Sequence, residues 1–263
     1  MGAILEGGCI VTDWESGSCV ENGTLRAYPQ IGRSNGAKAI SLRVLVFASG
    51  QSPSFQEVAS DVVLYVLEGE GNILLDGLPH SVAPETAVYV GPGSSFALVN
   101  PGSARLVLVS SRCPESDDRF GQAGIALAHG QARKSSPAVI RLSDSKSQIT
   151  ADRWYRVLID DRVGSAQVTQ FVGGIPPGRA PDHFHLYEEV LFILAGRGKI
   201  WAGESSASIA PGSCIYLPRK QVHCVENCGS GELRLLGVFY PAGSPAVRYD
   251  SPSGSSSSAS AAS

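Results

Sequence analysis

Three histidines and one glutamate in the C-terminal half of the chain have the residue types and the spacing of a metal site. His183 and His185 are two positions apart, so in a strand their side chains point to the same face. Continued alternation places Glu189 on that face, whereas its neighbour Glu188 points the other way. A third imidazole, His223, completes the site if its strand lies across the sheet or barrel from the first.

Three imidazoles and one carboxylate suit a divalent first-row transition metal: Fe, Mn, Co, Ni, Cu or Zn. Four protein ligands leave positions of an octahedral ion open for a substrate. Histidines are often exposed or hydrogen-bonded without a metal, but three of the five in this chain fall at these interlocking spacings. We therefore expect one divalent transition metal as cofactor, with His183, His185, Glu189 and His223 as its ligands.

The segments that must position these residues are short, rich in β-branched residues and bounded by Gly, Pro or Asn. Such segments, separated by turn residues, predict an all-β sandwich or barrel rather than βαβ units. A chain of 263 residues is long enough for about two domains. The predicted strands span residues 40–48, 62–67, 87–90, 105–110, 168–171, 189–195, 214–217 and 233–239.

An internal repeat relates the two halves of the chain. At a shift of 127 residues, positions 63–108 align with the second half without a gap. Glycine and proline fix special backbone angles, so their recurrence indicates recurring turns and hence two copies of one β fold. The identical pairs include Leu64/Leu191, Leu67/Leu194, Gly69/Gly196, Gly71/Gly198, Ile73/Ile200, Pro84/Pro211, Tyr89/Tyr216, Asn100/Asn227, Gly102/Gly229, Leu106/Leu233 and Leu108/Leu235.

The second copy resembles the cupin family in two motifs, G-x(4)-H-x-H-x(3)-E-x(6)-G and G-x(5)-P-x(4)-H-x(3)-N. The first motif has one residue fewer than usual between its first glycine and its first histidine. Lys220 stands where the family usually has glycine, so the turn before the last histidine is expected to differ in shape. The matching residues are Gly178, His183, His185, Glu189 and Gly196, then Gly212, Pro218, His223 and Asn227.

Together with the repeat, this resemblance implies a bicupin with two tandem double-stranded β-helix (jelly-roll) barrels. It covers residues 165–241 strongly and 40–113 through the repeat, and it places the metal inside the C-terminal barrel. The implied parts are an N-terminal arm (1–39), an N-terminal barrel (40–113), a connector with the first strands of the second module (114–160), a C-terminal barrel (161–249) and a disordered Ser/Ala-rich tail (250–263).

In the first copy, the same shift places Gln56, Val58, Val62 and Phe96 at the ligand positions. Two aliphatic side chains and a phenyl ring cannot coordinate a borderline cation, and a single glutamine would bind one weakly. We therefore expect a metal-free first barrel filled with apolar packing and serving a structural role, such as a dimer interface. Binding of an organic ligand there is an open alternative.

The resemblance implies several chemistries for this ligand set. The first is that of quercetinase-type dioxygenases, with Glu189 as the general base, so we expect a metal-dependent oxidoreductase acting on a small polar organic substrate. Oxalate-converting enzymes, sugar or keto-acid isomerases and a non-enzymatic metal- or ligand-binding cupin are alternatives. Ureidoglycine aminohydrolases share the layout, but their ligand set begins with Glu and ends with Gln, unlike His183 and His223 here.

Other residues near the motifs have two interpretations each. Tyr187 and Trp201 could line a pocket, although aromatic side chains in barrels are more often plain core. Arg179, Asp182 and Arg219 lie in predicted loops beside the ligands and could bind an anionic substrate or be solvated.

The composition argues against several kinds of partner. A net charge of −3 and the absence of a Lys/Arg block disfavour nucleic acid and anionic membrane surfaces. No apolar run reaches about 18 residues, and the N-terminus lacks the features of a signal peptide, so we expect a cytoplasmic protein. The six cysteines are then expected to be reduced thiols, and a homodimer is one assembly that family habit suggests.

Overall fold

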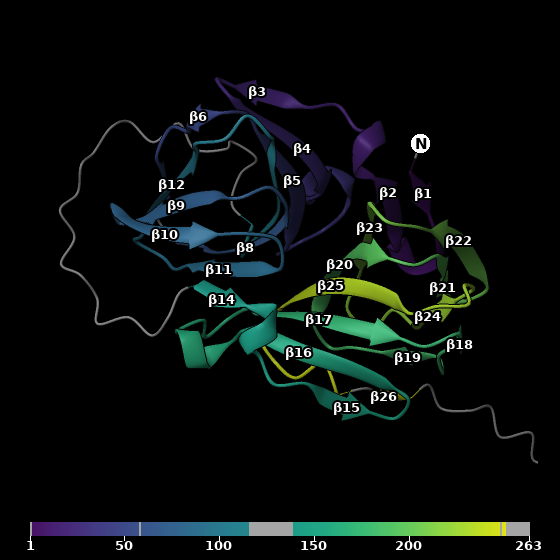
Figure 1. The fold of residues 1–263 in the computed structure, drawn as a ribbon. Coiled ribbons are helices and arrows are strands. Elements are labelled where there is room, and N and C mark those ends of the chain that lie inside the picture. The colour runs from purple at the N-terminus through teal and green to yellow at the C-terminus, as the bar shows by residue number, and fades with distance from the viewer. Residues whose placement is uncertain (1, 58, 116–138, 248, 251–263) are drawn as a thin grey trace, which may run out of the picture.

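Two β barrels packed side by side make up the computed structural model of the protein (Figure 1). The structure describes residues 2–57, 59–115, 139–247 and 249–250. Within these residues almost every element is a strand, and the helices are short 3-10 turns. The turns are η1 (Glu6–Gly8), η2 (Trp14–Ser16), η3 (Arg33–Asn35), η4 (Leu142–Asp144) and η5 (Asp161–Val163).

The first barrel is formed by a seven-stranded and a five-stranded antiparallel sheet. Its strands are β3 (Val20–Asn22), β4 (Leu25–Ile31), β5 (Ser41–Phe47), β6 (Gly50–Gln51), β7 (Phe55–Gln56), β8 (Asp61–Glu68), β9 (Gly71–Leu75), β10 (Leu78–Val82), β11 (Thr86–Val90), β12 (Ser95–Asn100), β13 (Leu106–Cys113) and β14 (Val139–Arg141). The larger sheet has the order β14-β11-β8-β13-β5-β4-β3, and the smaller has β10-β9-β12-β6, with β7 also paired to β12.

The second barrel repeats this plan with an eight-stranded and a six-stranded sheet. Its strands are β1 (Ala3–Ile4), β2 (Ile10–Asp13), β15 (Gln148–Thr150), β16 (Arg153–Ile159), β17 (Thr169–Ile175), β18 (Gly178–Arg179), β19 (His183–Phe184), β20 (Glu188–Ala195), β21 (Gly198–Ala202), β22 (Ser205–Ile209), β23 (Ser213–Leu217), β24 (His223–Asn227), β25 (Leu233–Tyr240) and β26 (Tyr249–Asp250). The orders are β1-β2-β23-β20-β25-β17-β16-β15 and β22-β21-β24-β19-β26, with β18 also on β24.

Each half of the chain contributes a strand to the barrel that is built mainly by the other half. β2, close to the N-terminus, pairs with β23 of the second barrel, from Ile10 opposite Tyr216 to Asp13 opposite Ser213. β14, which follows the first barrel in the chain, pairs with β11 of that barrel. The N-terminal segment 1–39 therefore supplies β1 and β2 to one barrel and β3 and β4 to the other (Figure 1).

The sequence repeat is visible in matching turns. Nδ2 of Asn100 donates to the carbonyl oxygen of Ala104 at 2.7 Å, and Nδ2 of Asn227 donates to that of Gly231 at 2.7 Å. These asparagines are one of the identical pairs in the sequence, and each closes the turn before the last long strand of its barrel. The prediction of an all-β chain with two tandem barrels is confirmed.

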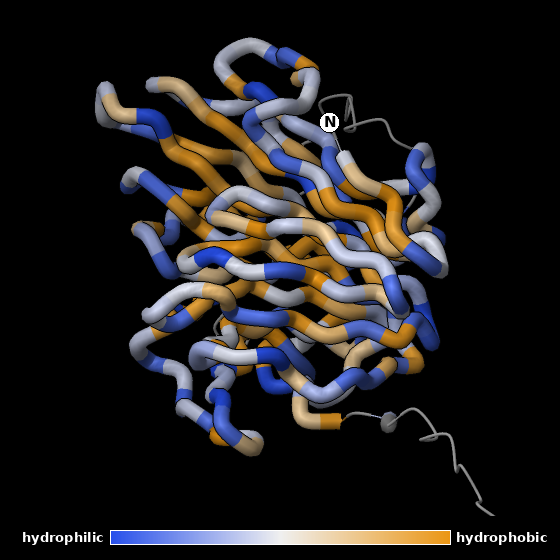
Figure 2. Tube along the Cα trace, turned by 90° about the vertical axis from the view of Figure 1, so that its right-hand side faces the viewer, coloured by the Kyte–Doolittle hydropathy of each residue, from blue (hydrophilic) through white to orange (hydrophobic). Residues whose placement is uncertain are grey.

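Apolar side chains form three clusters, one inside each barrel and one between the barrels. Along β8, Leu64 and Val66 point into the first barrel, whereas Val63 and Tyr65 point into the layer between the barrels. A strand buried on both faces needs a continuous apolar run rather than alternation, which explains the run DVVLYVL in β8. Figure 2 shows the hydrophobic segments along the strands and the hydrophilic ones mostly at their ends.

Candidate metal centre

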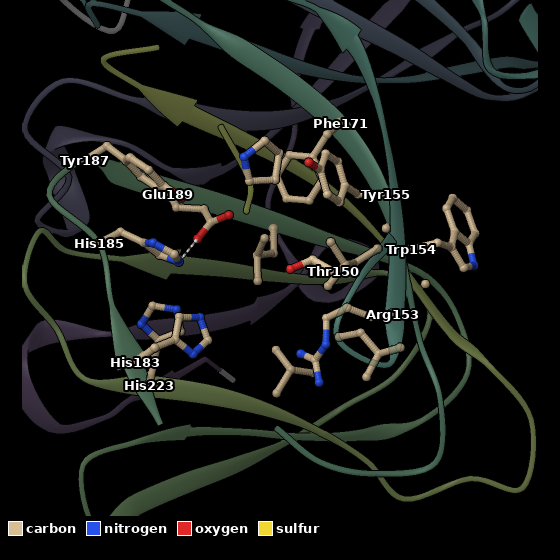
Figure 3. A pocket seen from close by; sticks show the side chains of 17 residues that line it. Thr150, Arg153, Trp154, Tyr155, Phe171, His183, His185, Tyr187, Glu189 and His223 are labelled. Carbon is tan, nitrogen blue, oxygen red and sulfur yellow. Dashed lines mark ion pairs between the residues drawn. The ribbon is translucent and has the colours of Figure 1, made fainter. Parts of the chain in front are cut away.

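His183 on β19, His185 just after it and His223 on β24 meet inside the second barrel (Figure 3). Their candidate ligand atoms all lie within 4.8 Å of one another. His183 is directly opposite His223 in the β19–β24 pair, with ring centroids 4.6 Å apart. The ring of His185 is 4.9 Å from that of His183 and 5.2 Å from that of His223. The structure thus brings the three predicted histidines together.

A backbone carbonyl fixes the orientation of each imidazole. Nδ1 of His183 and Nδ1 of His223 each lie near the carbonyl oxygen two residues earlier, at 2.9 and 2.8 Å. Nδ1 of His185 lies 3.1 Å from the carbonyl oxygen of Val247. A carbonyl oxygen only accepts hydrogen bonds, so Nδ1 carries the proton in each neutral ring. The lone pair is then on Nε2, which is the metal-binding atom of this tautomer.

Glu189 on β20 is buried and lines the same cavity as the histidines. Its Oε2 lies 3.8 Å from Nε2 of His185, but its carboxylate is outside the group of atoms that are all within 4.8 Å. Burial raises the pKa of this carboxyl to about 8. Glu188 points to the other side of the strand, where Oε2 accepts a hydrogen bond from the backbone N–H of Ala39 at 2.8 Å. The alternation of β20 therefore gives two adjacent carboxylates different surroundings.

The donor set fits a divalent transition metal. Burial, and secondarily the nearby His183, lower the pKa of His223 to about 4, so this ring is neutral at neutral pH. Nitrogen lone pairs that face one another in a buried site are stabilised by a shared cation, and neutral imidazoles with a carboxylate are ligands of borderline metals. Among the described residues, these three histidines are the group of His, Cys, Asp or Glu with metal-site spacing.

Aromatic side chains form one wall of the cavity, whose volume is about 100 Å³. Tyr187 stacks between the His185 ring, at 4.6 Å, and the Phe239 ring, at 4.1 Å. Phe171 also lines the cavity, and it has room because residue 237 is glycine. A Cβ atom on Gly237 would clash with the Phe171 ring. Tyr187 is therefore a lining residue, one of the two interpretations that the sequence left open.

Sequence reasoning missed the residues that line the cavity from the β15–β16 hairpin. Thr150 and Arg153 belong to this lining, and Figure 3 shows them on the side away from the histidines. The Arg153 guanidinium pairs with Asp152 at 3.1 Å, and only 16% of the Arg153 side chain is exposed. Arg153 and Tyr155, which alternate on β16, both line the cavity. Alternation in the sequence could have indicated that Arg153 and Tyr155 share a face. It could not have indicated that this face lines the cavity, because the sequence does not show which strand closes the barrel.

The charged loop residues considered in the sequence lie outside the cavity lining. Arg179 pairs with Asp182 at 3.2 Å, and its guanidinium lies 4.3 Å from the centre of the Trp201 ring. Nε1 of Trp201 donates to Glu226 at 2.7 Å. Arg219 is exposed. These residues form surface contacts beside the barrel rather than walls of the cavity.

The C-terminal strand β26 lies against the strand that carries the first histidine. Phe184 of β19 pairs with Tyr249, and their rings stack at 5.5 Å. The carbonyl of Val247, just before this strand, is the partner of His185. One of the three imidazoles is therefore held by a segment far along the chain, and the other two are held locally.

Strand pairing corrects two of the ligand-equivalent positions expected in the first barrel. Phe55 pairs with Phe96 in the first barrel, where His183 pairs with His223 in the second. Phe55, rather than Gln56, is therefore the counterpart of the first histidine.

The second correction concerns the counterpart of His185. The carbonyl of His185 accepts a hydrogen bond from the N–H of Lys220 at 2.7 Å. In the first barrel, the carbonyl of Glu57 accepts the equivalent bond from the N–H of Gly93 at 2.7 Å. Glu57 is therefore the counterpart, whereas Val58 lies outside the described residues. The first copy has one more residue before β8 than the second has before β20, so an ungapped shift loses the register in this loop.

Apolar packing fills the first barrel only in part. Phe55, Val62 and Phe96 are buried, as expected for a barrel without metal ligands. Beside them, however, Glu57 and Arg112 form a buried ion pair at 2.8 Å. The expectation of a purely apolar interior is therefore wrong at this end of the barrel.

Residues 171–239 match the family model of the cupin domain. This segment contains the three histidines and Glu189, and the first half of the chain repeats its fold. The second barrel therefore contains a cupin domain, and the chain has two barrels of one fold. The chain spans about half the length of the curated relatives it matches. Uncharacterized protein MJ1618 of Methanocaldococcus jannaschii is 37% identical over 54 residues, which are 20% of this chain and 43% of that protein. Uncharacterized protein SCO3923 of Streptomyces coelicolor is 37% identical over 57 residues, 22% of this chain and 53% of that protein.

Solved structures share the two-barrel fold at low sequence identity. A single-site mutant of Bacillus subtilis oxalate decarboxylase OxdC superposes with a TM-score of 0.70 at 12% identity, over 88% of this chain and 77% of that one. Protein Ylba from E. coli gives 0.72 at 11%, over 91% and 93%. AerE from Microcystis aeruginosa gives 0.66 at 15%, over 86% and 97%. At these identities the likeness concerns the fold alone.

Two further observations concern the helices and the cysteines. None of the described helices has the length and apolar character needed to cross a membrane. All six cysteines are free thiols in the structure. The expected tail and part of the expected connector lie outside the described residues.

Proposed function

We propose that the second barrel is a mononuclear metal-dependent active site that acts on a small organic anion, with dioxygenase-type oxidoreductase chemistry. The observation that supports it is the set of three imidazoles whose Nδ1 atoms are each held by a carbonyl, so that their Nε2 lone pairs are available to one ion. His183, His185 and His223 would hold the metal, with Glu189 as the fourth ligand. Holding ligands in place before binding lowers the cost of ordering them.

A bound divalent ion would supply Lewis acidity toward a carbonyl or enolate and, if redox-active, reactivity with dioxygen. Glu189 is the carboxylate of the described lining, and in its ionised form it would accept a proton from a substrate hydroxyl. Tyr187 and Phe171 make one wall of the site apolar, and Phe239 stacks on Tyr187. We found no other carboxylate among the described lining residues, so general-base chemistry is assigned to Glu189.

The position of Arg153 favours an anionic substrate. Arg153 is the one positively charged side chain of the described lining, and it is mostly buried. It faces the cavity from the side away from the histidines. A guanidinium binds carboxylates through paired hydrogen bonds. A molecule with a carboxylate at one end and metal-chelating oxygens at the other would contact both parts of the cavity.

Metal analysis and oxygen consumption test the proposal together. We expect protein purified without added metal to contain close to one equivalent of iron, copper, nickel or manganese. Oxygen uptake would then be measured with small carboxylates that have an adjacent hydroxyl or keto oxygen. A metal-free protein that takes up no metal on titration would contradict the metal site. A full metal complement without oxygen uptake by any of these acids would contradict the dioxygenase assignment and favour isomerase or hydrolase chemistry.

A further inference from the structure

The first barrel has a second, smaller cavity that is lined by charged side chains. Its volume is about 40 Å³, and its lining includes Arg43, Arg112, Glu57 and Ser110. Arg43 is 8% exposed, and the side chains of Arg112 and Glu57 are 16% and 11% exposed. This cavity occupies the place that the metal centre occupies in the other barrel.

Arg43, Arg112 and Ser110 replace apolar or small residues of the repeat, whereas Glu57 stands at the place of His185. In the second barrel, Glu189 of β20 lies opposite Phe239 of β25. The equivalent pair in the first barrel is Val62 of β8 and Arg112 of β13. Phe171 of the second barrel is likewise replaced by Arg43 in the first. The equivalent positions are Val62/Glu189, Arg112/Phe239, Arg43/Phe171 and Ser110/Gly237. At these positions the second barrel thus has a carboxylate and two phenyl rings, and the first has a valine and two guanidinium groups.

One buried donor of this lining has no acceptor among the described residues. The Glu57 carboxylate is in contact with Nη2 of Arg112 at 2.8 Å, and Nη2 of Arg43 donates to the hydroxyl of Ser41 at 3.4 Å. Nε of Arg112 is buried and has no hydrogen-bond partner among the described residues. A buried N–H donor that lacks an acceptor destabilises the folded protein. An oxygen of a small anion in the cavity would accept a hydrogen bond from Nε of Arg112.

We propose that the first barrel binds a small oxyanion, of the size and planar geometry of formate or bicarbonate, against Arg112 and Arg43. The fork of a guanidinium matches two oxygens of such an anion. The cavity exceeds the ~10–15 Å³ that one water needs, so it admits a ligand of a few heavy atoms. Ser110 contributes a hydroxyl to the lining where the second barrel has glycine. This site is separate from the proposed metal site and does not depend on it.

Isothermal titration of the full chain with sodium formate, sodium bicarbonate and sodium chloride tests the proposal. We expect saturable binding of one equivalent of formate or bicarbonate, with a Kd near the millimolar range, and binding of chloride weaker by about tenfold or more. Arg112→Lys keeps the charge but removes the fork, so it should weaken formate binding about tenfold. Ser110→Val fills the cavity without altering charge and should abolish binding, with the thermal unfolding midpoint reporting that the variant is folded.

The control variant removes the other site. His183→Ala combined with His185→Ala eliminates the proposed metal centre and should leave formate binding unchanged. Loss of binding in this double variant would overturn the proposal, because the anion would then belong to the metal site. Absence of saturable heat up to about 50 mM anion would also overturn it, as would equal affinity for chloride and formate.

Discussion

Glu188 and Glu189 are adjacent in sequence and face opposite sides of one strand. Glu189 lies in the cavity 3.8 Å from His185, whereas Glu188 accepts backbone hydrogen bonds from the loop at Ala39. Both are buried, so burial alone does not distinguish them. Their surroundings do, because period-two alternation sends one toward the imidazoles and the other toward the layer between the barrels.

Substitution of these two carboxylates and of a histidine should separate metal binding from folding. We expect His185→Ala and Glu189→Gln to lower metal affinity by at least ~10–100-fold, since even outer-shell changes have effects of that size. Glu188→Gln should leave the metal content unchanged and instead lower the free energy of unfolding by ~1–3 kcal/mol, because a buried charge-assisted hydrogen bond is weakened. Elemental analysis and urea unfolding measure the two effects. A loss of metal in Glu188→Gln with retention in Glu189→Gln would contradict the assignment.

Arg153 should determine selectivity for anions at the metal centre. In Co²⁺-substituted protein, titration with small carboxylates is expected to change the visible absorption of the ion. Arg153→Gln should weaken this binding about tenfold without changing cobalt stoichiometry, because one charge-assisted pair is lost. Arg179→Gln is the matched control, since Arg179 lies outside the described lining and on the surface. Equal binding in wild type and Arg153→Gln would exclude this role.

At the scale of elements, the C-terminal strand β26 is part of the metal centre although it contributes no ligand. It pairs with β19, and the carbonyl of Val247 just before it holds Nδ1 of His185. The outer partner of a ligand fixes its tautomer and its orientation. His183 and His223 have local partners instead, so the three imidazoles differ in what holds them.

Truncation after Gly243 should therefore weaken metal binding without abolishing it. The deletion removes the partner of one imidazole, so we expect the Kd for Zn²⁺ or Co²⁺ to rise ~10–100-fold while the barrel stays folded. Thr169, whose Oγ1 donates to the Gly243 carbonyl at 3.1 Å, keeps its partner in this variant. Removal of residues 251–263 alone is the control and should leave the Kd unchanged. Equal affinities of the two truncated proteins would show that β26 does not support the site.

At the scale of the whole molecule, the exchange of β2 and β14 makes the two barrels interdependent. β2 covers the edge of β23, and β14 covers the edge of β11. Both barrels also share the apolar layer between them, to which Tyr65 and Phe192 contribute. Exposed sheet edges and apolar surface promote aggregation, so neither barrel is complete without residues from the other half.

Expression of the second half alone tests this dependence. A fragment of residues 139–250 lacks β1 and β2 and exposes one face of the shared layer, so we expect it to be aggregated or partly unfolded. Co-expression with residues 1–115 should restore a soluble complex, because each fragment then supplies the missing strand. Size-exclusion chromatography and circular dichroism report the outcome. A stable, monomeric 139–250 fragment would show that the exchange is dispensable.

The sequence alone determined the all-β class, the two copies and the three histidines, because these follow from local rules. Alternation sets which residues share a face, and recurring glycines, prolines and asparagines mark the same turns in both halves. Alternation also distinguished Glu189 from Glu188, but the single strand assumed for it is broken, because β19 ends at Phe184 and β20 begins at Glu188 in another sheet.

Tertiary structure decided what depends on contacts between segments that are distant in sequence. It placed Arg153 in the cavity and the Val247 carbonyl behind His185, and it assigned β2 and β14 to opposite barrels. It also showed Glu57, not Val58, opposite the Gly93 turn, because one additional residue in a loop changes the register without leaving a periodic signal. Local patterns specify the face on which a side chain lies, but only strand pairing and closure of the barrel specify what that face meets.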